Sequence, residues 1–133
     1  MNNIKAIVKE IHHSNGVNIV EFDFNSHILS MMSLELSSNI QVGTAVILGT
    51  KPSHVTIAKD FDIEISYSNR LKTKIIDIIK GELLCTVIMS YEQTHIESLI
   101  TKKSLENMHL QINDEVVTLI KSSELFIKEV IND

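Results

Sequence analysis

The chain has 133 residues, of which 44% are hydrophobic and 22% charged, with a formal net charge of −5 at pH 7. This composition is typical of a folded globular protein and excludes a disordered or low-complexity chain. The acidic balance disfavours a nucleic-acid surface, and the absence of a long apolar run or a signal peptide predicts a cytoplasmic protein that contacts no membrane.

Short runs of isoleucine, valine and leucine, separated by polar turns, predict strands along the whole chain. In the first half we expect strands at Lys5–Ile11, Val17–Phe24, His27–Met32, Ala45–Leu48 and His54–Ala58. The segment Ser14-Asn15-Gly16 predicts a tight hairpin turn, because asparagine and glycine tolerate the backbone conformation that such turns require.

The second half begins after a short acidic connection, KDFDIEI, at residues 59–65. Strands are expected at Lys74–Ile79, Leu83–Met89, His95–Ile100, Glu115–Lys121 and Leu125–Lys128. One helix is predicted, over Lys102–Met108, with Thr101 as its N-cap.

The two halves are copies of one module. Ser30–Ile57 aligns with Ser98–Ile127 across a two-residue gap, and Asn2–Ile11 aligns with Asn69–Ile78 at an offset of 67. The predicted fold class is therefore all-β, with tandem five-stranded barrels that each carry one short helix. The predicted domains are 1–60 and 66–133. Modules this small are marginal alone, so a homo-oligomer is expected.

A candidate anion site lies in the second module. Thr101 and Ser104 place hydroxyls in the first turn of the predicted helix, and Lys121, Ser122 and Ser123 end a predicted strand. If these segments met, they would offer hydrogen-bond donors and one cation to a small oxyanion. Each residue also has an ordinary structural reading as a helix cap, a solvated lysine or a turn.

Other chemistry finds little support in the sequence. The six histidines lack metal-ligand spacing, and adjacent His12 and His13 in a strand point to opposite faces. Cys85 is the only cysteine, which excludes an internal disulfide. No nucleophile motif, glycine-rich phosphate loop or carboxylate pair emerges, so we predict a protein that is not an enzyme and has neither a metal site nor an organic cofactor.

Three segments of the second half are similar to a known protein family, namely SLITKKSLENMHL, VVTLIKSSELFI and SYSNRLKTKI. They resemble the molbindins, also called Mop or TOBE domains, and the whole chain resembles a di-domain molbindin. The resemblance implies OB-like barrels, a trimer, and cytoplasmic storage or homeostasis of molybdate or tungstate bound between modules. It assigns Thr101 and Ser104 to one side of the anion, and Lys121 and Ser122 of a neighbouring module to the other.

The resemblance also adds Ser66, which matches the serine of the family's Ser-Ala-Arg-Asn start, and it matches Ser33 and Lys51 of the first module with Thr101 and Lys121. Two departures weaken these sites: Ser68 stands at the arginine of that start, and Pro52 replaces Ser122 in the first module. The alternative function is a ligand-sensing or regulatory interaction module, of the transcription-regulator or transporter-accessory type.

Overall fold

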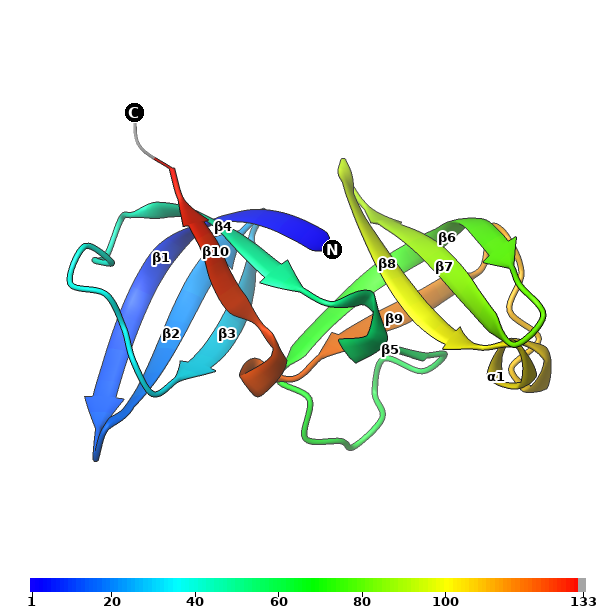
Figure 1. Ribbon diagram of the computed structural model, residues 1–133, viewed down its shortest axis with the longest axis horizontal. Coiled ribbons are helices and arrows are strands. Elements are labelled where there is room, and N and C mark those ends of the chain that lie inside the picture. The colour runs from blue at the N-terminus through cyan, green and yellow to red at the C-terminus, as the bar shows by residue number, and fades with distance from the viewer. Residues whose placement is uncertain (132–133) are drawn as a thin grey trace.

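The computed structural model describes residues 1–131, which form two curved sheets lying side by side (Figure 1). The first-half elements are β1 (Asn2–Ser14), β2 (Val17–Phe24), β3 (His27–Ser33), β4 (Ala45–Thr50), the 3-10 turn η1 (Pro52–His54) and β5 (Val55–Ala58). The second-half elements are β6 (Asn69–Lys80), β7 (Leu84–Tyr91), β8 (Thr94–Thr101), α1 (Lys102–Asn107), β9 (Glu115–Ile120), η2 (Ser122–Glu124) and β10 (Phe126–Val130). The predicted all-β class with two five-stranded sheets is confirmed.

The two sheets exchange their last strands. One sheet has the order β10-β4-β1-β2-β3 and the other has the order β5-β9-β6-β7-β8, and all pairs are antiparallel. We expected β5 to close the first module and β10 to close the second, within the predicted boundaries 1–60 and 66–133. Those boundaries describe the sequence repeat, but sheet membership crosses them. Residues 132 and 133 of the predicted second module lie outside the described part.

The local structure follows the sequence pattern closely. In β1 the side chains of Ile4, Ala6 and Val8 are buried and those between them are exposed, as expected for a strand with one face on the core. Asn15 and Gly16 both have positive φ, 51° and 77°, as required at the centre of a type I′ hairpin turn. The predicted turn is therefore confirmed.

The chain crosses between the sheets at two equivalent places, η1 after β4 and η2 after β9. η1 packs against β8 of the second module, and η2 packs against β3 of the first. His54 Nδ1 lies 2.7 Å from Glu124 Oε2, so the two crossovers contact each other directly. The strand exchange and this contact make the two modules one interlocked unit.

Two buried asparagines clamp the modules together. Asn2 Nδ2 donates to Glu97 O at 2.9 Å, and Glu97 N donates to Asn2 Oδ1 at 2.8 Å. Asn69 repeats this in the other direction, because its Nδ2 donates to Ser30 O at 2.9 Å and its Oδ1 accepts from Ser30 N at 2.7 Å. Each asparagine side chain thus makes the two backbone hydrogen bonds that a neighbouring strand would make with the edge strand of the opposite module. The two clamps occupy equivalent positions, as expected for approximate twofold symmetry between the modules.

The modules differ at the segment between their third and fourth strands. In the second module this segment contains α1, as predicted, with Thr101 as its N-cap. In the first module residues 34–44 form turns without a helix, so the expectation of one helix in each module is wrong for this copy. The segment is shorter, and its serines and asparagine favour turns over helix. Within residues 1–131, no helix is long and apolar enough to cross a membrane.

Candidate functional site

The helix turn of the second module gathers hydroxyl groups at the end of β8. Thr101 Oγ1 accepts a hydrogen bond from Ser104 N at 3.0 Å and donates one to Ser104 Oγ at 2.9 Å, and both side chains are exposed. Lys102 N donates to Leu83 O at 2.8 Å. Two backbone N–H groups of this turn are therefore already used, and the turn presents the Lys103 N–H and the Ser104 hydroxyl hydrogen to a ligand.

The crossover after β9 carries the other predicted donors. Lys121 is exposed and has an extended backbone at the N-cap of η2. Ser122 Oγ is hydrogen-bonded to Ser68 Oγ at 2.5 Å, so the serine at the place of the family's arginine contacts a predicted site residue. Ser66 is exposed in the connection before β6. The structure therefore gathers hydroxyls beside Lys121, with one hydroxyl hydrogen shared inside the Ser68–Ser122 pair.

These two groups of residues do not meet within one chain. Figure 1 shows α1 at the outer end of the second module, whereas η2 lies between the modules. Within residues 1–131, no hydrogen bond or ion pair joins Thr101 or Ser104 to Lys121 or Ser122. A single copy therefore does not assemble the predicted site, and a second copy would have to supply the missing half.

In the first module, the strand register shifts the predicted correspondence by one residue. Asn18 pairs with Ser33, and its counterpart Cys85, 67 residues later, pairs with Ile100. Leu34 and not Ser33 therefore occupies the place of Thr101, and a shift of one residue reverses the face on which a strand side chain lies. The Ser33 hydroxyl donates to Glu35 O instead of capping a helix.

The crossover of the first module keeps its lysine. Lys51 precedes η1 as Lys121 precedes η2, and it is exposed. Pro52 occupies the first position of η1, where it supplies neither a hydroxyl nor an N–H. The first module therefore retains a cation but lacks both the helix-turn hydroxyls and the serine of the second module.

Sequence reasoning missed the role of Arg70, the only arginine of the chain. Its Nε donates to Tyr67 O at 3.2 Å, and its terminal nitrogens donate to Phe61 O, Ile63 O and Ile65 O. The guanidinium thus holds the acidic connection between the modules in a compact loop. A lone arginine next to a loop gives no sequence signal for this role, because the carbonyl groups that it binds carry no side-chain pattern.

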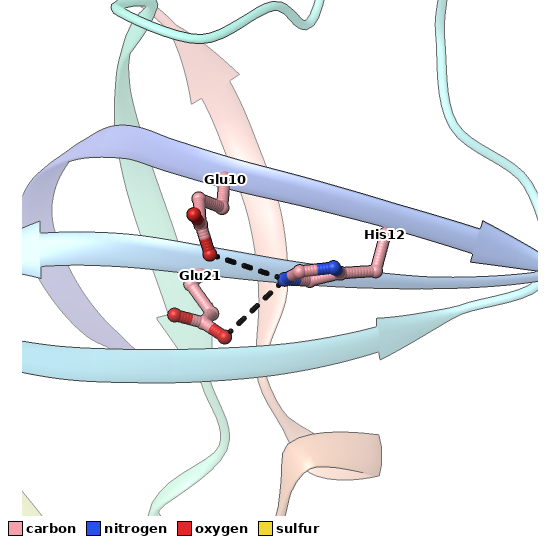
Figure 2. Close-up of side chains that lie close together, drawn as sticks. All are labelled: Glu10, His12 and Glu21. Atoms are coloured by element: carbon pink, nitrogen blue, oxygen red, sulfur yellow. Dashed lines mark ion pairs between the residues drawn. The ribbon is translucent and has the colours of Figure 1, made fainter.

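A second unexpected feature lies on the outer face of the first module. Glu10, His12 and Glu21 each place one possible metal-ligand atom within 4.8 Å of the others, from strands β1 and β2 (Figure 2). Glu10 and His12 share a face of one strand and are visible in the sequence. Glu21 is brought to them only by the register of the hairpin.

Comparison with known protein families gives one match. The sequence model of the TOBE domain matches residues 65–127, so the second module is a TOBE domain. The predicted resemblance to molbindins is thereby confirmed. Comparison with curated protein sequences gives no match.

Two of the solved structures that are similar to the chain are molybdate-binding proteins. One is a crystal structure of the cytoplasmic molybdate-binding protein ModG with molybdate bound. The match covers 95% of this chain and 94% of the ModG chain, with a TM-score of 0.89 and 21% sequence identity. The other is a molybdate-binding protein from Sporomusa ovata. The match covers 53% of this chain and 100% of the Sporomusa ovata chain, with a TM-score of 0.46 and 30% sequence identity. The ModG match establishes a shared two-module fold.

Proposed function

We propose that this protein is a cytoplasmic binding protein that stores and buffers molybdate or tungstate at interfaces between the modules of an oligomer. The observation that carries the proposal is the two-module fold that the chain shares with ModG, which is described as a cytoplasmic molybdate-binding protein. The second module adds hydrogen-bond donors that suit an oxyanion, in Thr101, Ser104, Lys121 and Ser122. In this proposal the oxyanion is a cargo, and the protein has a binding role and no catalytic one.

The donor set suits a fully deprotonated oxyanion. Hydroxyls, backbone N–H groups and an ammonium can all donate, whereas molybdate at neutral pH only accepts. Phosphate carries a proton near neutral pH, and if every hydroxyl of the site directs its hydrogen at the anion, that proton stays unpaired at a cost of about 1–3 kcal/mol. Sulfate has the right charge but is smaller, so the cavity must exclude it by size. Tungstate resembles molybdate in both respects, and we expect poor discrimination between the two.

The surroundings of the helix turn support an interface between copies. The tip of the β6–β7 hairpin, beside Thr101, exposes Leu83 and Leu84 to 80% and 50%, and both line one groove with Thr101. Exposed apolar patches of this kind mark interaction surfaces. A second copy that covers these leucines would bring its own crossover lysine and serine toward Thr101 and Ser104. We propose a trimer, as in the family.

Charge links anion binding to assembly. Each chain has a formal charge of −5, so an oligomer of this chain is strongly negative. Dianions bound between the copies would increase the repulsion unless lysines such as Lys121 face them and offset their charge. A ligand that binds only the assembled form stabilises that form by mass action. Occupied sites should therefore hold the oligomer together, which fits a store that fills when the anion is plentiful.

Calorimetric titration of the anion-free protein with molybdate, tungstate, sulfate and phosphate tests the proposal, with the mass in solution measured before and after. The first two anions are expected to bind, to an oligomer. Lys121→Ala should weaken molybdate binding about 10- to 100-fold, because a charged hydrogen bond contributes about 1.5–3 kcal/mol. Lys103→Ala, which removes an exposed helix lysine, is the matched control and should bind like the unaltered protein.

Two results would contradict parts of the proposal. Equal titration curves for the Lys121→Ala and Lys103→Ala variants would remove Lys121 from the site. A well-folded oligomer that binds none of the anions would favour the regulatory interaction module instead. The departures at Ser68, Pro52 and Leu34 would then have disabled the sites.

A further inference from the structure

Two glutamates face each other on the outer surface of the first module. Glu10 of β1 pairs directly with Glu21 of β2, immediately after a bulge between Val8 and Glu10 that resets the register. Side chains directly opposite on neighbouring strands share a face and lie close together, so two carboxylates in these positions repel each other. This placement is unfavourable unless a positive charge lies between them.

His12 completes the arrangement. It lies two residues beyond Glu10 and therefore on the same face of β1. Its Nε2 is 3.2 Å from Glu10 Oε2 and 3.5 Å from Glu21 Oε2. Figure 2 draws these two ion pairs as dashed lines. In a tetrahedral zinc site, bond lengths of about 2.0–2.2 Å separate neighbouring ligand atoms by about 3.3–3.5 Å. The two nitrogen–oxygen separations thus match those of ligands that share one zinc ion.

We propose that Glu10, His12 and Glu21 form a site for a divalent transition-metal cation, with Zn²⁺ as the best-fitting ion. A neutral imidazole and two carboxylates supply one nitrogen and two oxygen ligands, and their combined charge of −2 balances the cation. Ca²⁺ and Mg²⁺ favour oxygen ligands alone and more of them, so this set suits them poorly. The fourth position is open to water or to a group from another molecule.

The second module provides a natural comparison for this site. Its first hairpin has the same bulge, between Ile75 and Asp77, and the same register, in which Asp77 pairs with Ile88. The positions equivalent to Glu10, His12 and Glu21 are Asp77, Ile79 and Ile88. Because the backbone is the same and two ligands are missing, the fold itself does not require this cluster. Three metal-ligating side chains are a property of the first module alone.

The cluster is open to solvent and shares no residue with the proposed oxyanion site. The side chains of Glu10 and His12 are both 56% exposed and that of Glu21 is 33% exposed, so an ion can reach all three without unfolding. Exposed carboxylates can rotate to close around an ion. Replacing these outer-face side chains should leave the core intact, which makes the site testable in the folded protein.

The test is a calorimetric titration of the full chain with ZnCl₂, without a polyhistidine tag and after chelator treatment, in buffer free of phosphate and molybdate. One Zn²⁺ per chain is expected to bind. His12→Ala and Glu21→Gln should each weaken binding at least about tenfold, since loss of even an outer-shell partner of a metal site costs about 10- to 100-fold. His95→Ala, an exposed histidine of the second module, is the matched control and should bind zinc unchanged.

Cobalt provides a second readout. Co²⁺ in place of Zn²⁺ should give a visible absorption band that disappears in the Glu21→Gln variant and persists in the Lys121→Ala variant. Circular dichroism of each variant checks that it is folded. The proposal is overturned if the unaltered protein binds no Zn²⁺, or if folded His12→Ala and Glu21→Gln variants bind it as tightly as the unaltered protein does. The cluster would then be a histidine–carboxylate ion pair only.

Discussion

The two modules have the same backbone fold but differ in the side chains of their interiors. Both have the same strand order, the same bulge in the first hairpin and the same crossover to the neighbouring sheet. Buried positions that hold Ala6, Met31 and Leu48 in the first module hold hydroxyl-bearing residues in the second, namely Thr73, Ser98 and Thr118. One backbone thus accepts either apolar residues or hydroxyl-bearing residues at these three interior positions.

The polar interior is tolerated because its hydroxyls bond one another and the backbone. Thr73 Oγ1 and Thr118 Oγ1 lie 3.0 Å apart, and Ser98 Oγ donates to Val55 O at 2.6 Å. The second of these bonds ties the exchanged strand β5 to its adopted module. A buried polar group is costly mainly when it has no partner, and each of these three hydroxyls has one.

The largest expected effect comes from placing a hydroxyl in the apolar module. Leu48→Thr should lower the free energy of unfolding by about 3 kcal/mol, measured by urea denaturation, because the new hydroxyl faces Ala6 where its counterpart Thr118 faces Thr73. Leu48→Val is the matched control, since valine has the shape of threonine without the oxygen, and it should cost about 1 kcal/mol. Equal costs for the two variants would show that the first interior also offers a hydrogen-bond partner.

Next in size is the asparagine clamp. Asn69→Ala removes two hydrogen bonds to Ser30 and should cost about 2–3 kcal/mol in the unfolding free energy, because backbone groups at a partly buried strand edge lose their partner. Asn2→Ala tests the symmetry and should cost a similar amount.

Asn3→Ala is the control for the clamp. Asn3 lies on the exposed face and accepts one bond from Lys128 Nζ at 2.7 Å, so its loss should cost less than about 0.5 kcal/mol. If Asn69→Ala is as mild as Asn3→Ala, the Asn69 clamp contributes little to holding the modules together.

The smallest expected effect is a gain. In the described part of the chain, the Thr50 hydroxyl is buried without a hydrogen-bond partner, and the equivalent residue of the second module is Ile120. Thr50→Val should therefore raise the unfolding free energy by up to about 1 kcal/mol in the same assay. Thr44→Val, which removes an acceptor for Gln41 N, should instead lower it. A loss of stability in Thr50→Val would indicate a bound water at that hydroxyl.

Much of the local structure could be predicted from the sequence. Alternating apolar residues predicted β2 from Val17 to Phe24 with its observed bounds, Asn15 and Gly16 predicted the turn, and Thr101 predicted the start of α1. These features depend on residues close together in the chain, where period, turn chemistry and capping are directly readable. The absence of a helix after β3 was not predicted, because the first module was expected to resemble the second.

The candidate sites were only partly predictable. Thr101 with Ser104 and Lys121 with Ser122 were found as two local groups from their spacing, and only the family resemblance assigned the two groups to different modules. Glu21 was missed beside His12 because a strand residue meets its partner only through the register of the ladder. The same register displaced Ser33 from the position expected for it.

Short-range sequence patterns were sufficient to predict the two-module repeat, the strands and the inward faces of the strands. The sheets that β5 and β10 join could not be predicted in this way, because they depend on contacts between the modules. These two short strands contain apolar residues that could pack on either sheet, so the choice depends on the crossovers at η1 and η2 and on the Asn2 and Asn69 clamps. Those contacts join residues more than 30 positions apart, and their energies arise only when the two modules meet.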